Sequence, residues 1–133
     1  MILGAPHRSG ARRGPPAFTE YDIRPRWVPV RDGQACGVAS VEMEVSIVIR
    51  LPIGVSSGVE RWLRRHENGH RRLVEEASEA LLSRLEAARA PSCPGLAGRV
   101  DRIVRDASRE LEAAHARYDG IGETPLPEGL RRF

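Results

Sequence analysis

The chain lacks lysine and is poor in aromatic residues. All 21 basic residues among its 133 are arginine, and 18 acidic residues leave a net charge of +3. Because acids and arginines are interleaved, we expect a solvated mixed-charge surface and no nucleic-acid partner. An aromatic share of 5% argues against a base-stacking platform. No run approaches the roughly 18 apolar residues of a membrane span, so we expect none.

Cysteine is also scarce, with only Cys36 and Cys93. The count fits one disulfide and equally fits two reduced thiols. A bond between them would stabilise the fold by about 4 kcal/mol and would indicate an oxidising compartment. The apolar start, Met1–Ala5, is too short for the core of a signal peptide. From the residues alone, a cytoplasmic location therefore stays open.

The length and the hydrophobic share of 41% predict one globular domain with a single core. Residues 1–17 are rich in glycine, proline and arginine and show no periodicity, so we expect a flexible leader there. The remaining residues, 18–133, are expected to form the domain. Nothing in the sequence indicates its oligomeric state.

The first half of the domain has the pattern of strands. Short β-type pieces cover Phe18–Ile23 and Trp27–Val30, and Pro25 and Pro29 confine them to sheet edges or strand starts. The clearest strand runs over 41–49, where apolar and polar residues alternate with a period of two. This pattern predicts an antiparallel sheet with one face on a core.

Two helices are expected in the second half, over Val59–Ala90 and Leu96–Tyr118, joined by a turn at 91–95. Ser57 and Glu60 have the spacing of a capping box at the start of the first helix. The fold class is therefore α+β, with a small antiparallel sheet packed on a long two-helix hairpin.

The first predicted helix contains an H-E-x-x-H motif at 66–70. Residues four apart project from one helix face, so His66 and His70 can reach the same zinc ion. Glu67 lies beside them, close enough to act as general base on a water held by the metal. Alternatively, the histidines are satisfied core residues and Glu67 is a surface charge.

Gly69, inside the motif, is costly within a helix, by about 1 kcal/mol relative to alanine. Its presence indicates the close approach of a strand, a substrate or a neighbouring helix.

A third ligand is expected from the second helix or just beyond it. In an antiparallel hairpin centred near 92–93, facing residues have numbers that sum to about 185. His70 then faces His115 and His66 faces Asp119, with Glu123 shortly after. Tyr118, nearby, could donate a hydrogen bond to an oxyanion or could simply pack. His115 could also be a partly buried histidine at a helix end.

Several features in order resemble one bacterial family: Tyr21-Asp22-Ile23, Cys36, the strand ending at Leu51-Pro52, Trp62 before His66-Glu67-Asn68-Gly69-His70, Cys93 and Tyr118-Asp119. The family is that of predicted secreted zinc-dependent proteases, a zincin-like domain of unknown function. The similarity covers about 17–119. It implies a zincin-like fold, zinc (Zn²⁺) on His66 and His70, Glu67 as catalytic base, a Cys36–Cys93 disulfide and a secreted or periplasmic location.

The chain departs from that family after Tyr118-Asp119, where the family usually has a T-x-H-G segment with a histidine that looks like the third ligand. Here Gly120–Thr124 contains no histidine, so we take Glu123 as the third ligand, with Asp119 or His115 as alternatives. The resulting hypothesis is a zinc metallopeptidase acting on a peptide or protein substrate. The alternative is a catalytically degenerate relative that serves as a binding module.

Overall fold

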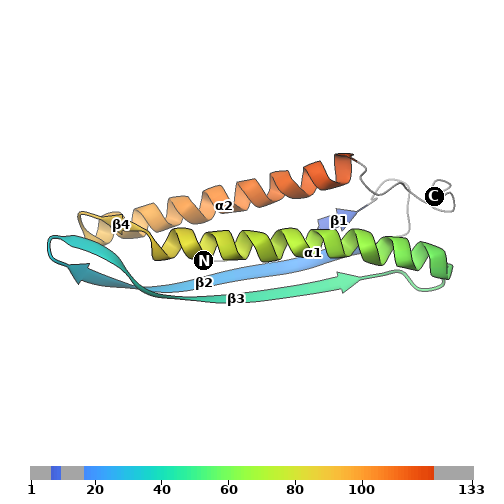
Figure 1. Ribbon diagram of the computed structural model, residues 1–133, viewed down its shortest axis with the longest axis horizontal. Coiled ribbons are helices and arrows are strands. Elements are labelled where there is room, and N and C mark those ends of the chain that lie inside the picture. The colour runs from blue at the N-terminus through green and yellow to red at the C-terminus, as the bar shows by residue number, and fades with distance from the viewer. Residues whose placement is uncertain (1–6, 10–16, 122–133) are drawn as a thin grey trace.

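Two long strands and two long helices make up most of the molecule, here a computed structural model that describes residues 7–9 and 17–121 (Figure 1). The elements in chain order are β1 (His7–Ser9), β2 (Ala17–Asp32), β3 (Ala35–Arg50), α1 (Ser57–Glu86), β4 (Arg89–Ala90) and α2 (Cys93–Ile121). The strands form one antiparallel sheet in the order β1-β2-β3-β4. The α+β class and the helical hairpin are as expected. Most of the expected leader, 1–17, lies outside the described residues.

β2 is one continuous strand of 16 residues, not the two short pieces expected from its prolines. β1 pairs only with Ala17–Thr19, so both prolines lie where β2 is paired with β3 alone in the described part of the chain. A proline is tolerated on such an edge because its missing N–H costs no ladder bond there. Pro29 also adjoins a register shift after Val28. The edge position was therefore predicted correctly, but the break was not.

The two faces of the β2–β3 hairpin differ in polarity, as the period of two predicts. Along β2 the buried positions alternate and include Ala17, Thr19, Tyr21 and Ile23. The opposite face carries ion pairs across the strands, between Arg50 and Glu20 at 3.2 Å and between Arg26 and Glu42 at 3.4 Å. Both helices contact the hairpin and cover its apolar face.

α1 begins and ends earlier than the sequence suggests. Its N-cap is Ser56, not Ser57, because the Ser56 hydroxyl accepts from the Val59 amide at 3.3 Å. The helix ends at Glu86, and Arg89–Ala90 instead pair with Cys36 and Gly37 of β3. The expected helix end is therefore wrong, because the last residues of that stretch join the sheet.

α2 begins three residues before its expected start. Ser92 caps it, since its hydroxyl accepts from the Gly95 amide at 3.1 Å and its carbonyl accepts from the Leu96 amide at 2.9 Å. Its first residue, Cys93, forms a disulfide with Cys36 of β3, as the resemblance implied. The bond joins two residues that are 57 positions apart in the sequence and ties the start of α2 to the sheet.

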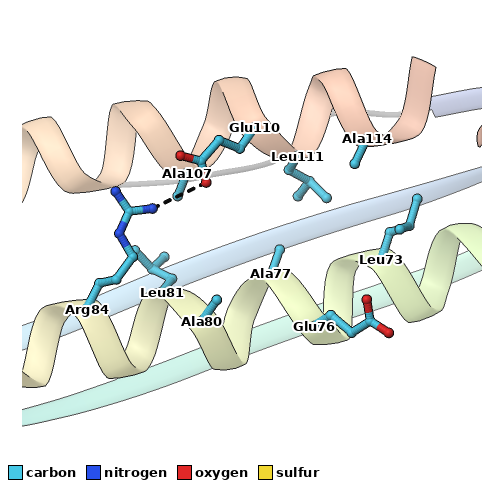
Figure 2. Close-up of a pocket in the computed structure, with 10 residues that line it drawn as sticks. All are labelled: Leu73, Glu76, Ala77, Ala80, Leu81, Arg84, Ala107, Glu110, Leu111 and Ala114. Carbon is cyan, nitrogen blue, oxygen red and sulfur yellow. Dashed lines mark hydrogen bonds and ion pairs between the residues drawn. The ribbon is translucent and has the colours of Figure 1, made fainter. Parts of the chain in front are cut away.

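The core lies between the sheet and the two helices. Its largest fully buried apolar side chains are Ile23, Leu81, Leu85, Leu96, Val74 and Val100. Small residues leave a groove of about 220 Å³ between α1 and α2, where Ala77 and Ala107 lie and where Arg84 and Glu110 form an ion pair at 3.3 Å (Figure 2). Among the described residues, neither helix is apolar enough over a sufficient length to cross a membrane.

Tyr21 gives the core a pH-sensitive group. Burial raises the pKa of its phenol above the ordinary value of 10.0, and the negative charge of Glu112 on α2 adds to the rise. The folded state thus holds this proton more tightly than the unfolded state. Because the chain has no lysine, tyrosines are the only side chains that ordinarily titrate near that pH.

We expect the free energy of unfolding to fall as the pH rises above about 10, where the unfolded state loses the Tyr21 proton first. Below that pH the contribution is fully present. Denaturant unfolding of wild type and Tyr21→Phe across this range measures it. The variant should show a shallower fall, and an equal fall in both proteins would mean that another group is responsible.

Candidate metal centre

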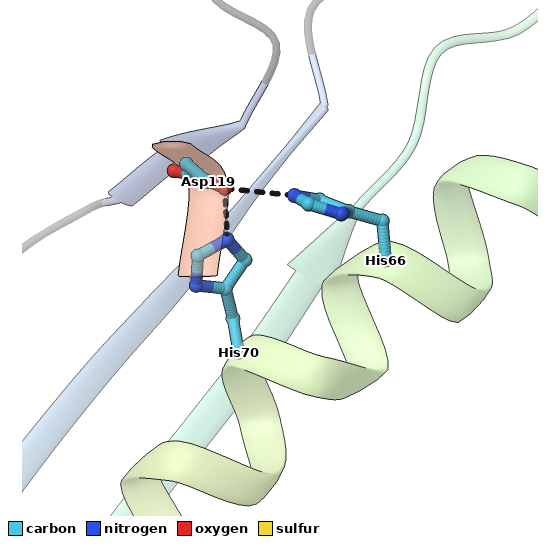
Figure 3. A group of neighbouring side chains, drawn as sticks. All are labelled: His66, His70 and Asp119. Carbon is cyan, nitrogen blue, oxygen red and sulfur yellow. Dashed lines mark hydrogen bonds and ion pairs between the residues drawn. The ribbon is translucent and has the colours of Figure 1, made fainter. Parts of the chain in front are cut away.

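Three side chains converge where the first half of α1 meets the end of α2 (Figure 3). His66 and His70 lie one turn apart on α1, and Asp119 reaches them from α2. The Oδ1 atom of Asp119 lies 2.7 Å from His66 Nε2 and 2.8 Å from His70 Nε2. Because a carboxylate only accepts, both rings donate to the same oxygen. The ligand atoms of the three residues all lie within 4.8 Å of one another.

The antiparallel register predicted from the helical hairpin is confirmed. His66 faces Asp119 and His70 faces His115, each pair summing to 185. Both histidines of the motif are buried. Glu123, the third ligand expected from the sequence, lies outside the described residues. Asp119, named as its alternative, is the carboxylate that the described structure brings to both histidines.

The His66 ring is held by two aromatic rings. Trp62, one turn earlier on α1, stacks on it with ring centroids 5.2 Å apart and an interplanar angle of 4°. Tyr118 of α2 also stacks on it, with centroids 4.7 Å apart and an angle of 24°. The same Tyr118 ring lies edge-on to His70 at 4.8 Å. These contacts restrict the rotamer of His66 and keep Nε2 directed at Asp119.

Gly69 permits this close approach of α2. A Cβ atom at position 69 would lie 2.0 Å from Tyr118 Oη and 2.2 Å from its Cζ. With no side chain there, the Tyr118 hydroxyl crosses α1 and donates to the His66 carbonyl at 3.0 Å. Of the three causes considered for this glycine, the structure therefore shows the neighbouring helix. Tyr118 packs and positions the motif.

Glu67 points toward the sheet and is fully buried. Its Oε1 atom accepts a hydrogen bond of 2.8 Å from the Thr19 hydroxyl of β2. Its Oε2 atom has no hydrogen-bond partner among the described residues. Glu67 is therefore not the surface charge of the alternative interpretation. A buried carboxylate oxygen without a partner is costly and points to a missing ligand, water or proton.

Thr19 was not recognised as a site residue from the sequence. The available signal was its place in a row of alternating inward-facing residues, where Ala17 and Ile23 have no polar side-chain atom. A hydroxyl in such a row needs a partner. The strand pattern predicts which face of the sheet a residue lies on, but it does not predict which helix residue its side chain contacts.

His115 contacts His70 on the ring nitrogen that does not face Asp119. Its Nδ1 atom is 2.6 Å from His70 Nδ1, and only 1% of the residue is exposed. Tyr21 packs against its ring with centroids 5.3 Å apart. His115 is thus a buried partner of His70, and the group of possible ligands comprises His66, His70 and Asp119.

This donor set suits a metal ion. Two imidazoles and a carboxylate are ligands that zinc commonly takes in catalytic sites. Here two N–H protons point at one carboxylate oxygen, a position where a cation could replace both.

Comparison with protein families identifies the chain. A family model described as a bacterial protein of unknown function, DUF922, matches residues 3–123. The chain belongs to DUF922. Comparisons with curated proteins and with solved structures found no match. The matched residues include the strands, the H-E-x-x-H motif and Asp119, and the family is described as one of unknown function.

We expect Gly69→Ala to destabilise the protein by about 1–3 kcal/mol, because the new methyl group overlaps Tyr118. The matched control is Gly98→Ala on α2, where a Cβ atom would meet nothing within 4 Å. That variant should gain up to about 1 kcal/mol from helix propensity. Denaturant unfolding measures both.

A Tyr118→Ala background provides the decisive comparison for Gly69. The cost of Gly69→Ala should largely disappear once the Tyr118 ring is removed. If Gly69→Ala costs the same with and without Tyr118, the contact between them does not explain the glycine.

Proposed function

We propose that this protein is a zinc-dependent hydrolase whose ion is held by His66, His70 and Asp119. The observation that carries the proposal is the convergence of both Nε2 atoms on one oxygen of Asp119, at 2.7 and 2.8 Å. Glu123, outside the described residues, is the alternative carboxylate. When bound, zinc lowers the pKa of a water to about 7 and polarises a carbonyl group.

Glu67 is the general base in this proposal. Glu67 directly follows His66 and lies three residues before His70 on α1, which is the place of the base in an H-E-x-x-H helix. The Thr19 hydroxyl holds Oε1 at 2.8 Å and leaves Oε2 available to accept a proton from the attacking water. Burial excludes bulk solvent from this carboxylate and strengthens its electrostatic interactions.

Within the class of zinc-dependent hydrolases, we propose more specifically a metallopeptidase with a zincin-like fold. It rests on the H-E-x-x-H helix, with its base beside two histidines, and on the resemblance to predicted secreted zinc-dependent proteases. The Cys36–Cys93 disulfide supports the export that this resemblance implies, since disulfides persist in oxidising compartments. The substrate would then be a peptide or protein outside the cytoplasm.

The second candidate is a non-enzymatic binding module built on the same hairpin. Two observations favour it: the chain has no histidine at 120–124, and Glu67 is fully buried. In this case the His66, His70 and Asp119 cluster would serve structure, with or without a metal. Metal content and the effect of Glu67 on hydrolysis separate the two candidates.

We expect the purified protein to bind one zinc ion per chain. His66→Ala and His70→Ala should abolish tight binding, because each removes a ligand, and Asp119→Asn should weaken it strongly. The control for Asp119→Asn is Asp101→Asn, because Asp101 is an exposed aspartate that also lies on α2. Competition with a chelator measures each affinity.

Glu123→Gln completes the comparison. If Glu123→Gln weakens binding and Asp119→Asn does not, Glu123 is the third ligand and the assignment to Asp119 is wrong. Absence of zinc from wild type, or equal affinity in wild type and His66→Ala, would contradict the metal site itself.

Glu67→Gln should lower hydrolysis of an unstructured protein such as casein by about 10²–10⁴-fold, the usual contribution of a general base. Its zinc content should stay at the wild-type level, because Glu67 is not a ligand. Glu79→Gln, an exposed change on the same helix, is the matched control. Wild-type turnover in Glu67→Gln would remove Glu67 from the mechanism, and a zinc-loaded wild type without hydrolysis would favour the binding module.

A further inference from the structure

The buried contact between His70 and His115 carries a proton that the hydrolase mechanism does not use. Their Nδ1 atoms are 2.6 Å apart and their rings are tilted by 33°, with centroids 4.8 Å apart. His70 is 0% exposed and His115 is 1% exposed. At this distance one nitrogen must donate and the other must accept, because two lone pairs or two N–H groups would repel.

In the absence of a metal, the contact between His70 and Asp119 determines which of the two histidine rings donates the Nδ1 hydrogen bond. His70 Nε2 carries a proton there, since the carboxylate accepts from it at 2.8 Å. A neutral His70 then has an unprotonated Nδ1, which accepts from the Nδ1–H of His115. In this state each of the two rings holds one proton.

The hydrogen bond between the two rings would reverse its direction if His70 Nε2 bound a metal, because that nitrogen must then be unprotonated. The proton of a neutral His70 lies on Nδ1 and is donated to His115 Nδ1, which leaves the His115 proton on Nε2. The pair again holds two protons. An imidazole at position 115 can take either role, whereas a carboxylate could only accept.

We propose that His115 is a positioning residue that orients the His70 ring and accepts its Nδ1 proton when Nε2 binds zinc. The inference rests on the proposed metal centre. Outer partners of this kind fix the orientation and tautomer of a ligating histidine and raise its basicity. The surroundings of His115 support a fixed ring, since Tyr21 packs on it and the residue is excluded from solvent.

The test compares His115→Asn with His115→Leu. The two side chains have nearly the same shape, but asparagine carries an oxygen close to the position of Nδ1 and can accept or donate there. Leucine can do neither. Zinc affinity, measured by competition with a chelator, should fall by about 10–100-fold in His115→Leu and remain close to wild type in His115→Asn. His115→Met serves as a second apolar variant if the leucine variant does not fold.

Ring nitrogen chemical shifts of the zinc-loaded wild type give an independent readout. They should show the His70 proton on Nδ1 and the His115 proton on Nε2. Equal affinity in wild type and His115→Leu would overturn the positioning role while leaving the metal centre intact. Equal large losses in both variants would instead make His115 a ligand, and a wild type without zinc would overturn the proposed function and this inference together.

Discussion

The close approach of α1 and α2 at Gly69 is the constraint on which the polar cluster depends. Tyr118 can cross α1 there only because position 69 has no side chain, and its hydroxyl bonds the His66 carbonyl. This contact fixes the distance and register of the two helices near the end of α2. With that register, Asp119 faces His66 and His115 faces His70.

Each member of the H-E-x-x-H motif has its own support from a different element. Stacked rings hold His66, a buried imidazole contacts His70, and a strand hydroxyl binds Glu67. Buried polar groups are expensive unless they are hydrogen-bonded, and a domain of this size has little hydrophobic core to offset them. The concentration of such groups in one place therefore favours a functional centre over a purely structural one.

The sequence predicted the parts of this centre that follow from regular geometry. Helical spacing brings His66 and His70 to one face, and the antiparallel hairpin correctly pairs them with His115 and Asp119. Thr19 could not be predicted as the partner of Glu67, because strand periodicity does not give the packing of a sheet on a helix. The choice between Asp119 and Glu123 was also open, since the sequence places both near the end of the second helix.

The α+β fold class and the presence of two helices could be predicted from the sequence. The residues at which the helices begin and end could not. Arg89 and Ala90 continue a helical pattern but pair with β3, so a long-range ladder overrides local preference. The prolines of β2 break strands only where a ladder bond is needed, and the sequence does not show which edge is free. Local patterns thus fail where the outcome depends on a distant partner.

The central claim is that His66, His70 and Asp119 hold a metal ion, and a crystal structure of the zinc-loaded protein tests it most directly. An anomalous difference map collected at the zinc absorption edge should show one peak within about 2.0–2.2 Å of both Nε2 atoms and an oxygen of Asp119. A map without a peak at this position, with Asp119 still bonded to both histidines, would contradict the account.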